Sequence, residues 1–255
     1  MREEIRKGEA KEIIKIENLK RYFKVGEETV KALRGVSFTI YEGEFVTIMG
    51  TSGSGKSTLL NTLGCLDTPT SGQYLLDGIS VQKMGKNERA RIRNRKIGFI
   101  FQNYNLLPKT TAMENVELPL LYNSAVSAKE RAERAEKCLR EVGLGERLYH
   151  KSNQMSGGQQ QRVAIARALV NNPVIILADE ATGNLDTRTS FSILTLFQRL
   201  HREGKTIIFV THNPDLALYS SRNIMLRDGR IVSDEYNHDI QSAEEVYRNL
   251  PVDNE

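Results

Sequence analysis

Residues 50–57 read GTSGSGKS and match the spacing G-x-x-x-x-G-K-[ST] without a gap. Glycines let this backbone curl so that consecutive N–H groups point inward, and a following helix adds the positive end of its dipole. The lysine supplies a point charge for terminal phosphates, and the serine hydroxyl is a hard oxygen ligand suited to Mg²⁺. We predict a phosphate-binding loop whose nucleotide contacts are Ser52, Gly53, Ser54, Gly55, Lys56, Ser57 and Thr58.

A second acidic site is expected where the apolar run VIILADE, at 174–180, ends in two carboxylates. Runs of this kind finish on the ligand side of a parallel sheet. Asp179 is predicted to hold Mg²⁺ through water, together with Ser57, and Glu180 to polarise an attacking water. The alternative, two solvated acids at a strand end, fits poorly beside a phosphate-binding loop.

The surrounding pattern indicates the elements that position these groups. Segments EIIKIENL, VSFTI and EFVTIMG, within 12–50, read as short strands of an antiparallel sheet joined to a parallel one. After Ser54, helices alternate with apolar strands, which is typical of a parallel sheet covered on both faces. The stretch at about 105–155 interrupts this alternation and looks helical. Within it, Ser127 and Glu130 form a capping box, and Gly143 is the expected helix stop.

Composition limits the class of protein. The chain has 255 residues, of which 39% are hydrophobic and 27% charged, as in ordinary globular domains. No apolar run approaches a membrane span and the charged N-terminus lacks a signal-peptide core, so we expect a cytoplasmic location. Cys65 and Cys138 fit no metal-ligand spacing and are expected to be free, partly buried thiols.

Charge is uneven along the chain. The formal net charge of +4 is too small to argue for nucleic acid as a partner. The segment 83–96 carries seven basic residues and one acid, and the tail from 233 carries seven acids. Both fit solvated surface. The basic segment also fits a helix that faces a partner or acidic lipid headgroups.

Four further short motifs stand in a fixed order around the carboxylates. FQ at 101–102 ends a strand, SGGQ at 156–159 opens a helix, GNLD occupies 183–186, and TH at 211–212 ends the next strand. Over about residues 12–235 the chain therefore resembles the nucleotide-binding subunit of ATP-binding cassette (ABC) transporters. A P-loop kinase lacks SGGQ, and a relative acting on nucleic acid or ribosomes usually carries two cassettes or a coiled coil. That last class remains the alternative.

The resemblance implies roles for individual residues. Gln102 would reach Mg²⁺ and the attacking water, and His212 would contact the γ-phosphate and hold Glu180 in place. Phe23 would stack on adenine beside Val30, with Tyr22 or a buried core role for Phe23 as the alternatives. The contacts to ATP held by a second, head-to-tail copy would be Ser156, Gly157, Gly158, Gln159 and Asp186. The two glycines could instead serve close packing in an ordinary capped helix.

The implied fold is an α/β P-loop NTPase core with a parallel sheet, an N-terminal antiparallel β-subdomain and an inserted α-helical signature subdomain. A single domain, 1–255, would divide into a core (12–104 and 166–235), a helical subdomain (105–165) and charged extensions (1–11 and 236–255). Mg²⁺ is the implied cofactor and ATP the substrate of this Mg-dependent ATPase.

The partners implied are a second copy of the chain and an integral membrane permease, on the cytoplasmic face of the membrane. Segments such as GCLDTPTSG at 64–72 resemble the subgroup that exports macrolides, peptides or lipoproteins. Ala181 and Met155 depart from that subgroup, which usually has proline and leucine there. The permease is expected in a groove near Gln102, against Leu106, Leu107 and Met113, unless these three pack inside the helical part.

Overall fold

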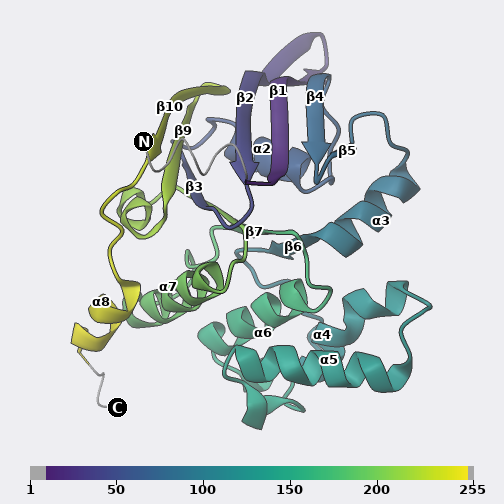
Figure 1. The fold of residues 1–255 in the computed structure, drawn as a ribbon, viewed down its shortest axis with the longest axis vertical. Coiled ribbons are helices and arrows are strands. Elements are labelled where there is room, and N and C mark those ends of the chain that lie inside the picture. The colour runs from purple at the N-terminus through teal and green to yellow at the C-terminus, as the bar shows by residue number, and fades with distance from the viewer. Residues whose placement is uncertain (1–9, 252–255) are drawn as a thin grey trace.

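The computed structural model describes residues 10–251 as a mixed α/β fold built on two sheets. Figure 1 shows the antiparallel sheet at the top of the view and helices α4, α5 and α6 grouped below the strands. The predicted combination of an antiparallel sheet, a parallel sheet with helices and a helical insert is confirmed.

A four-stranded antiparallel sheet has the order β2-β1-β4-β5. Its strands are β1 (Glu12–Val25), β2 (Glu28–Tyr41), β4 (Ser71–Leu76) and β5 (Ile79–Ser80). The first two strands are longer than the sequence indicated, because they continue past the core as a two-stranded ribbon. Polar and charged residues dominate that ribbon, so no alternating apolar pattern marked it in the sequence.

The second sheet has the order β10-β9-β3-β8-β7-β6, and all its neighbours are parallel except β9 and β10. Its strands are β3 (Phe45–Met49), β6 (Ile97–Ile100), β7 (Ile175–Asp179), β8 (Ile207–Thr211), β9 (Arg222–Arg227) and β10 (Arg230–Tyr236). Side chains alternate between two cores: Phe45 packs with one apolar cluster, Val46 and Ile48 with the other. Helices and the antiparallel sheet bury these two faces.

The helical elements follow the expected pattern along the chain. They are α2 (Lys56–Leu63), α3 (Lys86–Lys96), α4 (Ala112–Glu117), α5 (Ala128–Glu141), α6 (Gly157–Leu169), α7 (Thr187–Arg202) and α8 (Ala243–Asn249), with short 3₁₀ turns η1 (Leu118–Tyr122), η2 (Gly145–Arg147), η3 (Ser152–Gln154) and η4 (Pro214–Tyr219). The hydroxyl of Ser127 accepts from the N–H of Glu130 at the start of α5, and Gly143 follows its end with φ 80°. The N-cap and the stop were therefore predicted correctly.

Two expectations about boundaries need adjustment. Residue 165 lies within α6, which packs against α4, α5 and β6, so a division there cuts a continuous helix. The segment after Tyr236 is more than a solvated tail, because Ala243 is fully buried and α8 packs on α7. Residues 1–9 and 252–255, the remainder of the predicted extensions, lie outside the described residues.

No helix within residues 10–251 is both long and apolar enough to cross a membrane. Cys65 and Cys138 are both free and buried, as predicted. Met155 and Ala181, the two departures from the resemblance, both lie in the apolar core beneath the helical part. Neither side chain reaches the surface that carries the candidate site.

Candidate functional site

The phosphate-binding loop lies at the centre of the parallel sheet. It follows β3, which is hydrogen-bonded to β8 on one side and β9 on the other, and it leads into α2. Gly53 and Gly55 have φ of 78° and 105°, which residues with a Cβ rarely adopt. A Cβ on Gly55 would also lie 2.6 Å from the carbonyl oxygen of Ala32. The loop therefore requires glycine for its conformation and for its packing.

Lys56 lies across the mouth of this loop. Its Nζ donates to the carbonyl oxygens of Gly50, at 2.7 Å, and Thr51, at 2.9 Å. The side chain is buried, so its charge is held beside the first N–H groups of α2 instead of extending into solvent. Positive charge and helix N-terminus together form an anion site.

A cleft of about 840 Å³ opens beside the loop. It brings together most of the predicted residues: Val30, Ser52, Gly53, Gly55, Lys56, Ser57, Thr58, Asp179, Glu180 and His212. Ser54 lies beneath the loop instead, with a buried Oγ that has no hydrogen-bond partner in the structure. Its N–H donates to Thr51 within the loop.

Asp179 ends β7 facing the cleft. Burial raises the pKa of its carboxyl, the neighbouring Glu180 raises it further, and Lys56 opposes both. The folded protein therefore favours the protonated form more than the unfolded chain does, so this group lowers stability as the pH rises through its pKa. A bound cation would reverse that penalty.

Glu180 adopts a left-handed conformation, with φ 44°, directly after Asp179. Its N–H donates to Val210 of the neighbouring strand, which fixes the turn. Nδ1 of His212 lies 2.8 Å from Oε1 of Glu180. Because an ionised carboxylate only accepts hydrogen bonds, the imidazole donates here and holds the carboxylate in one orientation.

The oxygen donors in the cleft suit Mg²⁺. Ser57 and Asp179 line the same cavity, and hydroxyl and carboxylate oxygens are the ligands this ion prefers. No group of three His, Cys, Asp or Glu side chains that could cage a metal occurs within residues 10–251. The residues therefore fit an ion that completes its shell with phosphate oxygens and water, not a protein-only site.

Gln102 does not line the cleft. Its side-chain amide lies 3.5 Å from Asn184 Oδ1, and Asn184 Nδ2 donates to the Gln102 carbonyl at 3.3 Å. A Cβ on Gly183 would lie 2.9 Å from Gln102 Nε2 and 3.5 Å from Glu180 Oε2. Gln102 and Glu180 thus flank the same glycine, although only Glu180 faces the cavity.

The predicted signature residues form a capped helix start away from the cleft. Ser156 and Gln159 make a reciprocal capping box at the N-terminus of α6. A Cβ on Gly157 would lie 2.8 Å from the Tyr104 hydroxyl, and one on Gly158 2.4 Å from Thr189 Cγ2. Close packing therefore already requires both glycines. None of residues 156–159 lines the cleft, and Asp186 caps α7 through Thr189.

Phe23 lies on the β1–β2 ribbon directly opposite Val30. The Arg21 guanidinium lies 4.2 Å above its ring centroid. Phe23 belongs to neither described apolar cluster, which excludes the core role, but it does not line the cleft as Val30 does. Stacking by Phe23 on a base remains a prediction.

Several cleft residues were missed from sequence. They are Thr29, Lys31, Ala32, Arg34, Val210, Asp228 and Gly229. The pair Asp228–Gly229 forms the β9–β10 turn, with both φ positive, and Gly229 N–H donates to the Ser54 carbonyl. A D-G pair between two strands is a strong hairpin signal and marked the turn, but only the fold places it on the phosphate loop.

Comparison with known proteins finds a matching family model and closely similar sequences. A protein-family model described as ABC transporter matches residues 33–183. The chain is 58% identical over 221 residues to an uncharacterized ABC transporter ATP-binding protein of Thermotoga maritima, covering 87% of this chain and 94% of that one. It is 53% identical to the macrolide export ATP-binding/permease protein MacB of Syntrophobacter fumaroxidans, covering 86% of this chain and 31% of MacB.

A solved structure agrees in fold as well as sequence. The ATP-binding cassette MJ0796, from Methanocaldococcus jannaschii, is described as a dimer in a post-hydrolysis state bound to ADP and Pi. It matches with a TM-score of 0.80 and 49% identity, covering 88% of this chain and 98% of that chain.

Proposed function

The chain belongs to the ABC transporter family and is an ATPase of the ATP-binding cassette type, and we propose that two copies work head to tail to drive a separate membrane permease. The subgroup of its relatives, which includes MacB, supports export of drugs, peptides or lipoproteins. The working location in this proposal is the cytoplasmic face of the membrane.

The separation of two half-sites carries the proposal. The cleft contains the phosphate loop and both carboxylates, whereas Ser156–Gln159 open another helix and do not line that cavity. The dimeric post-hydrolysis MJ0796 structure supports completing the site with a second copy. In that arrangement the partner copy supplies the hydroxyl of Ser156 and the N–H groups at the start of α6 to the γ-phosphate.

The chemistry is in-line attack of water on the γ-phosphate. Lys56 and the loop N–H groups bind the terminal phosphates. Ser57 and Asp179, joined by Gln102 once it turns toward the cleft, would hold Mg²⁺, which supplies charge neutralisation at the phosphates. Glu180, oriented by His212, accepts a proton from the attacking water.

Glu180→Gln tests the function directly. The amide cannot accept the proton, so hydrolysis should fall at least a hundredfold, within the range typical of a general base. ATP binding should persist, since Lys56 and the loop are intact. One negative charge per copy also leaves the closed interface, so a dimer should accumulate in Mg-ATP during size-exclusion chromatography.

Two controls define the result. The same variant in Mg-ADP should remain monomeric, and Glu180→Gln combined with Lys56→Ala should not dimerise because nucleotide is lost. A Glu180→Gln protein that hydrolyses ATP at the wild-type rate would remove Glu180 from its role, and one that stays monomeric in ATP would count against the head-to-tail site.

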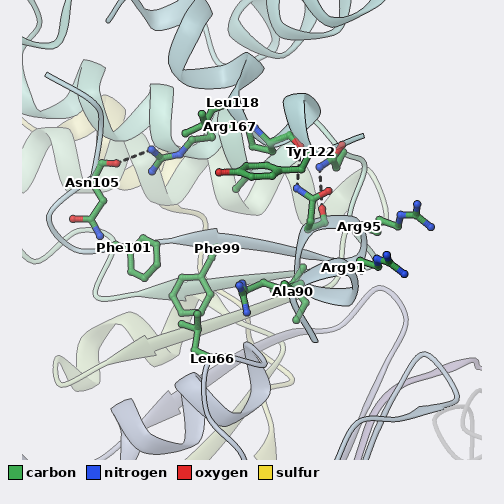
Figure 2. A pocket seen from close by; sticks show the side chains of 16 residues that line it. Leu66, Ala90, Arg91, Arg95, Phe99, Phe101, Asn105, Leu118, Tyr122 and Arg167 are labelled. Carbon is green, nitrogen blue, oxygen red and sulfur yellow. Dashed lines mark hydrogen bonds between the residues drawn. The ribbon is translucent and has the colours of Figure 1, made fainter. Parts of the chain in front are cut away.

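A groove between the core and the helical part is the proposed permease site. Figure 2 shows this groove, of about 650 Å³, with Phe99 and Phe101 on one side and Leu118 and Tyr122 on another. The two phenylalanine rings stack with centroids 4.3 Å apart. Four arginines and no acidic residue are among the described residues that line it. This chemistry fits a cytoplasmic helix of the permease with an apolar face and acidic residues.

The apolar lining differs from the sequence-based expectation. Met113 is buried in the core, with 7% of its surface exposed, and Leu106 packs against the same cluster. Leu107 is exposed but does not line the groove. The predicted surface at Leu106 and Met113 is therefore wrong. Met113 lies on α4, which packs on α5 and α6, and Leu106, which precedes α4, packs against the same cluster. The alternative, packing inside the helical part, holds for both.

A further inference from the structure

The segment after Gln102 has an unusual backbone. Tyr104 and Asn105 are consecutive and both left-handed, with φ of 59° and 49°. Residues other than glycine avoid this region, so two in succession need outside support. Within the segment one short backbone hydrogen bond, from Asn105 N–H to the Asn103 carbonyl at 2.5 Å, provides only part of it.

Arg167 supplies that support from helix α6. Its Nη1 donates to the Asn105 carbonyl and its Nη2 to the Tyr104 carbonyl, both at 2.7 Å. Figure 2 shows the guanidinium reaching from the helix toward Asn105 at one end of the groove. Burial lowers the pKa of this arginine, and the described residues provide no carboxylate partner for it. Its hydrogen bonds are thus committed to the backbone of this one segment.

Two further contacts tie the same segment down. The Tyr104 hydroxyl packs against Gly157, at the first turn of α6, so closely that a Cβ there would lie 2.8 Å away. On the other side, Asn184 Nδ2 donates to Asn103 Oδ1 at 2.8 Å. The segment therefore touches α6 at two places, its N-terminal signature turn and Arg167 two to three turns later.

We propose that Arg167 is a positioning residue that locks the segment 102–105 to the signature helix, so that Gln102 and the trans ATP contact at Ser156–Gln159 move as one body. A shift of Gln102 on contact with nucleotide then displaces the signature turn directly. The inference rests on the proposed function for the roles of Gln102 and the signature turn. Arg167 itself touches no reacting atom.

Arg167→Lys is the sharpest substitution. Lysine keeps the charge but is a flexible point donor that cannot serve both carbonyls in the fixed fork of a guanidinium. In the Glu180→Gln background, we expect the ATP concentration for half-maximal dimerisation to rise at least tenfold. Mg-ADP affinity of the monomer should change less than twofold, because Arg167 does not line the nucleotide cleft.

Arg162→Lys is the matched control. Arg162 lies on the same helix and donates to the Val142 carbonyl and to Ser192 Oγ, both at 2.7 Å, so it anchors α6 elsewhere. Arg162→Lys should lower the unfolding temperature by about as much as Arg167→Lys does. It should leave the ATP concentration for half-maximal dimerisation within twofold of the Glu180→Gln parent. Equal loss of dimerisation in both variants would reduce Arg167 to a stabilising residue and overturn the proposal.

Hydrogen exchange tests the lock without a dimer. In the nucleotide-free monomer, Arg167→Lys should speed exchange at least tenfold at the amides of 103–107 and at those of Gly157–Gln159 together. Arg162→Lys should speed neither. Unchanged exchange in Arg167→Lys, or a change confined to one of the two segments, would overturn the proposal. Failure of the Glu180→Gln parent to dimerise would instead count against the proposed function.

Discussion

At the scale of single residues, the contacts of a side chain distinguish between roles that its residue type alone allows. Phe23 could have been a core residue, but it lies on an exposed ribbon with Arg21 over one face of its ring. An aromatic ring held this way by a cation offers its other face for stacking. Val30, directly opposite on the next strand, extends the same surface to the nucleotide cleft.

Phe23→Ala should weaken nucleotide binding and leave hydrolysis at saturating ATP largely intact. Stacking contributes roughly 1–3 kcal/mol per base, so the apparent ATP constant should rise about fivefold to 150-fold. Because stacking carries no hydrogen-bond code, GTP should compete with ATP within about tenfold. A nucleotide titration measures both effects.

Tyr22→Ala is the control for that prediction. Tyr22 is the adjacent residue on the strand, so its side chain points to the other face. Its removal should leave nucleotide affinity unchanged. The opposite pattern, with affinity lost in Tyr22→Ala alone, would transfer the stacking role to Tyr22.

At the scale of elements, the contact between α6 and α7 explains the second signature glycine, Gly158, without any ligand. Gly158 is buried against Thr189, which belongs to the first turn of α7. Asp186 caps that same turn. The two predicted trans contacts, Gly158 and Asp186, thus lie at paired helix starts, and their packing is required in the monomer before any partner arrives.

Gly158→Ala should destabilise the protein by about 1–3 kcal/mol, the usual cost of overpacking. Thr189→Ser removes the methyl group that the new Cβ would meet at 2.4 Å and should restore most of that stability. Chemical denaturation measures both variants. Full stability in Gly158→Ala alone would mean that α6 and α7 adjust freely, contrary to the close packing described.

Elements with strong local signals were predicted from sequence. The phosphate loop, the N-cap Ser127 and the strand ending at Asp179 each carry their own pattern. What failed depended on distant partners. Met113 was misplaced because α4 has only six residues, too few for a clear apolar stripe. Its side chain is buried in the apolar cluster where α4 packs on α5 and α6. The packing of α8 likewise depends on α7.

At the scale of the whole molecule, the groove is one of two sites where a protein partner is proposed. Its rim carries Arg91 and Arg95, both exposed on α3. This helix forms most of the basic segment 83–96, for which the sequence left two interpretations, a partner or acidic lipid. The apolar floor next to these charges favours a protein helix, because headgroups alone would not use stacked phenylalanines.

Tyr122→Asp should abolish association with membranes from the cells that make this chain, while ATP binding by the isolated protein stays within twofold. Tyr122 is 78% exposed, so the change leaves the core intact. Tyr149→Asp, at a tyrosine that is 76% exposed away from the groove, is the matched control. Co-sedimentation with those membranes measures the association.

Protein-free vesicles of the same lipids distinguish a protein partner from acidic lipid headgroups as the ligand of the basic helix. Wild-type protein should not sediment with them. If the wild-type protein did sediment with them and an Arg91→Glu, Arg95→Glu double variant did not, the helix would bind lipid headgroups. Undiminished membrane association of Tyr122→Asp would place the permease contact elsewhere.

The position of β3 sets an order of events during synthesis. The strand that precedes the phosphate loop forms its hydrogen bonds with β8 and β9, which begin about 160 and about 175 residues later in the chain. At a ribosomal rate of roughly 5–20 residues per second, β3 waits about 8 to 30 s for the first of these neighbours. The nucleotide cleft is therefore among the last parts to form. A ribosome that stops early releases a chain with its phosphate loop complete in sequence, yet with both edges of β3 open to aggregation.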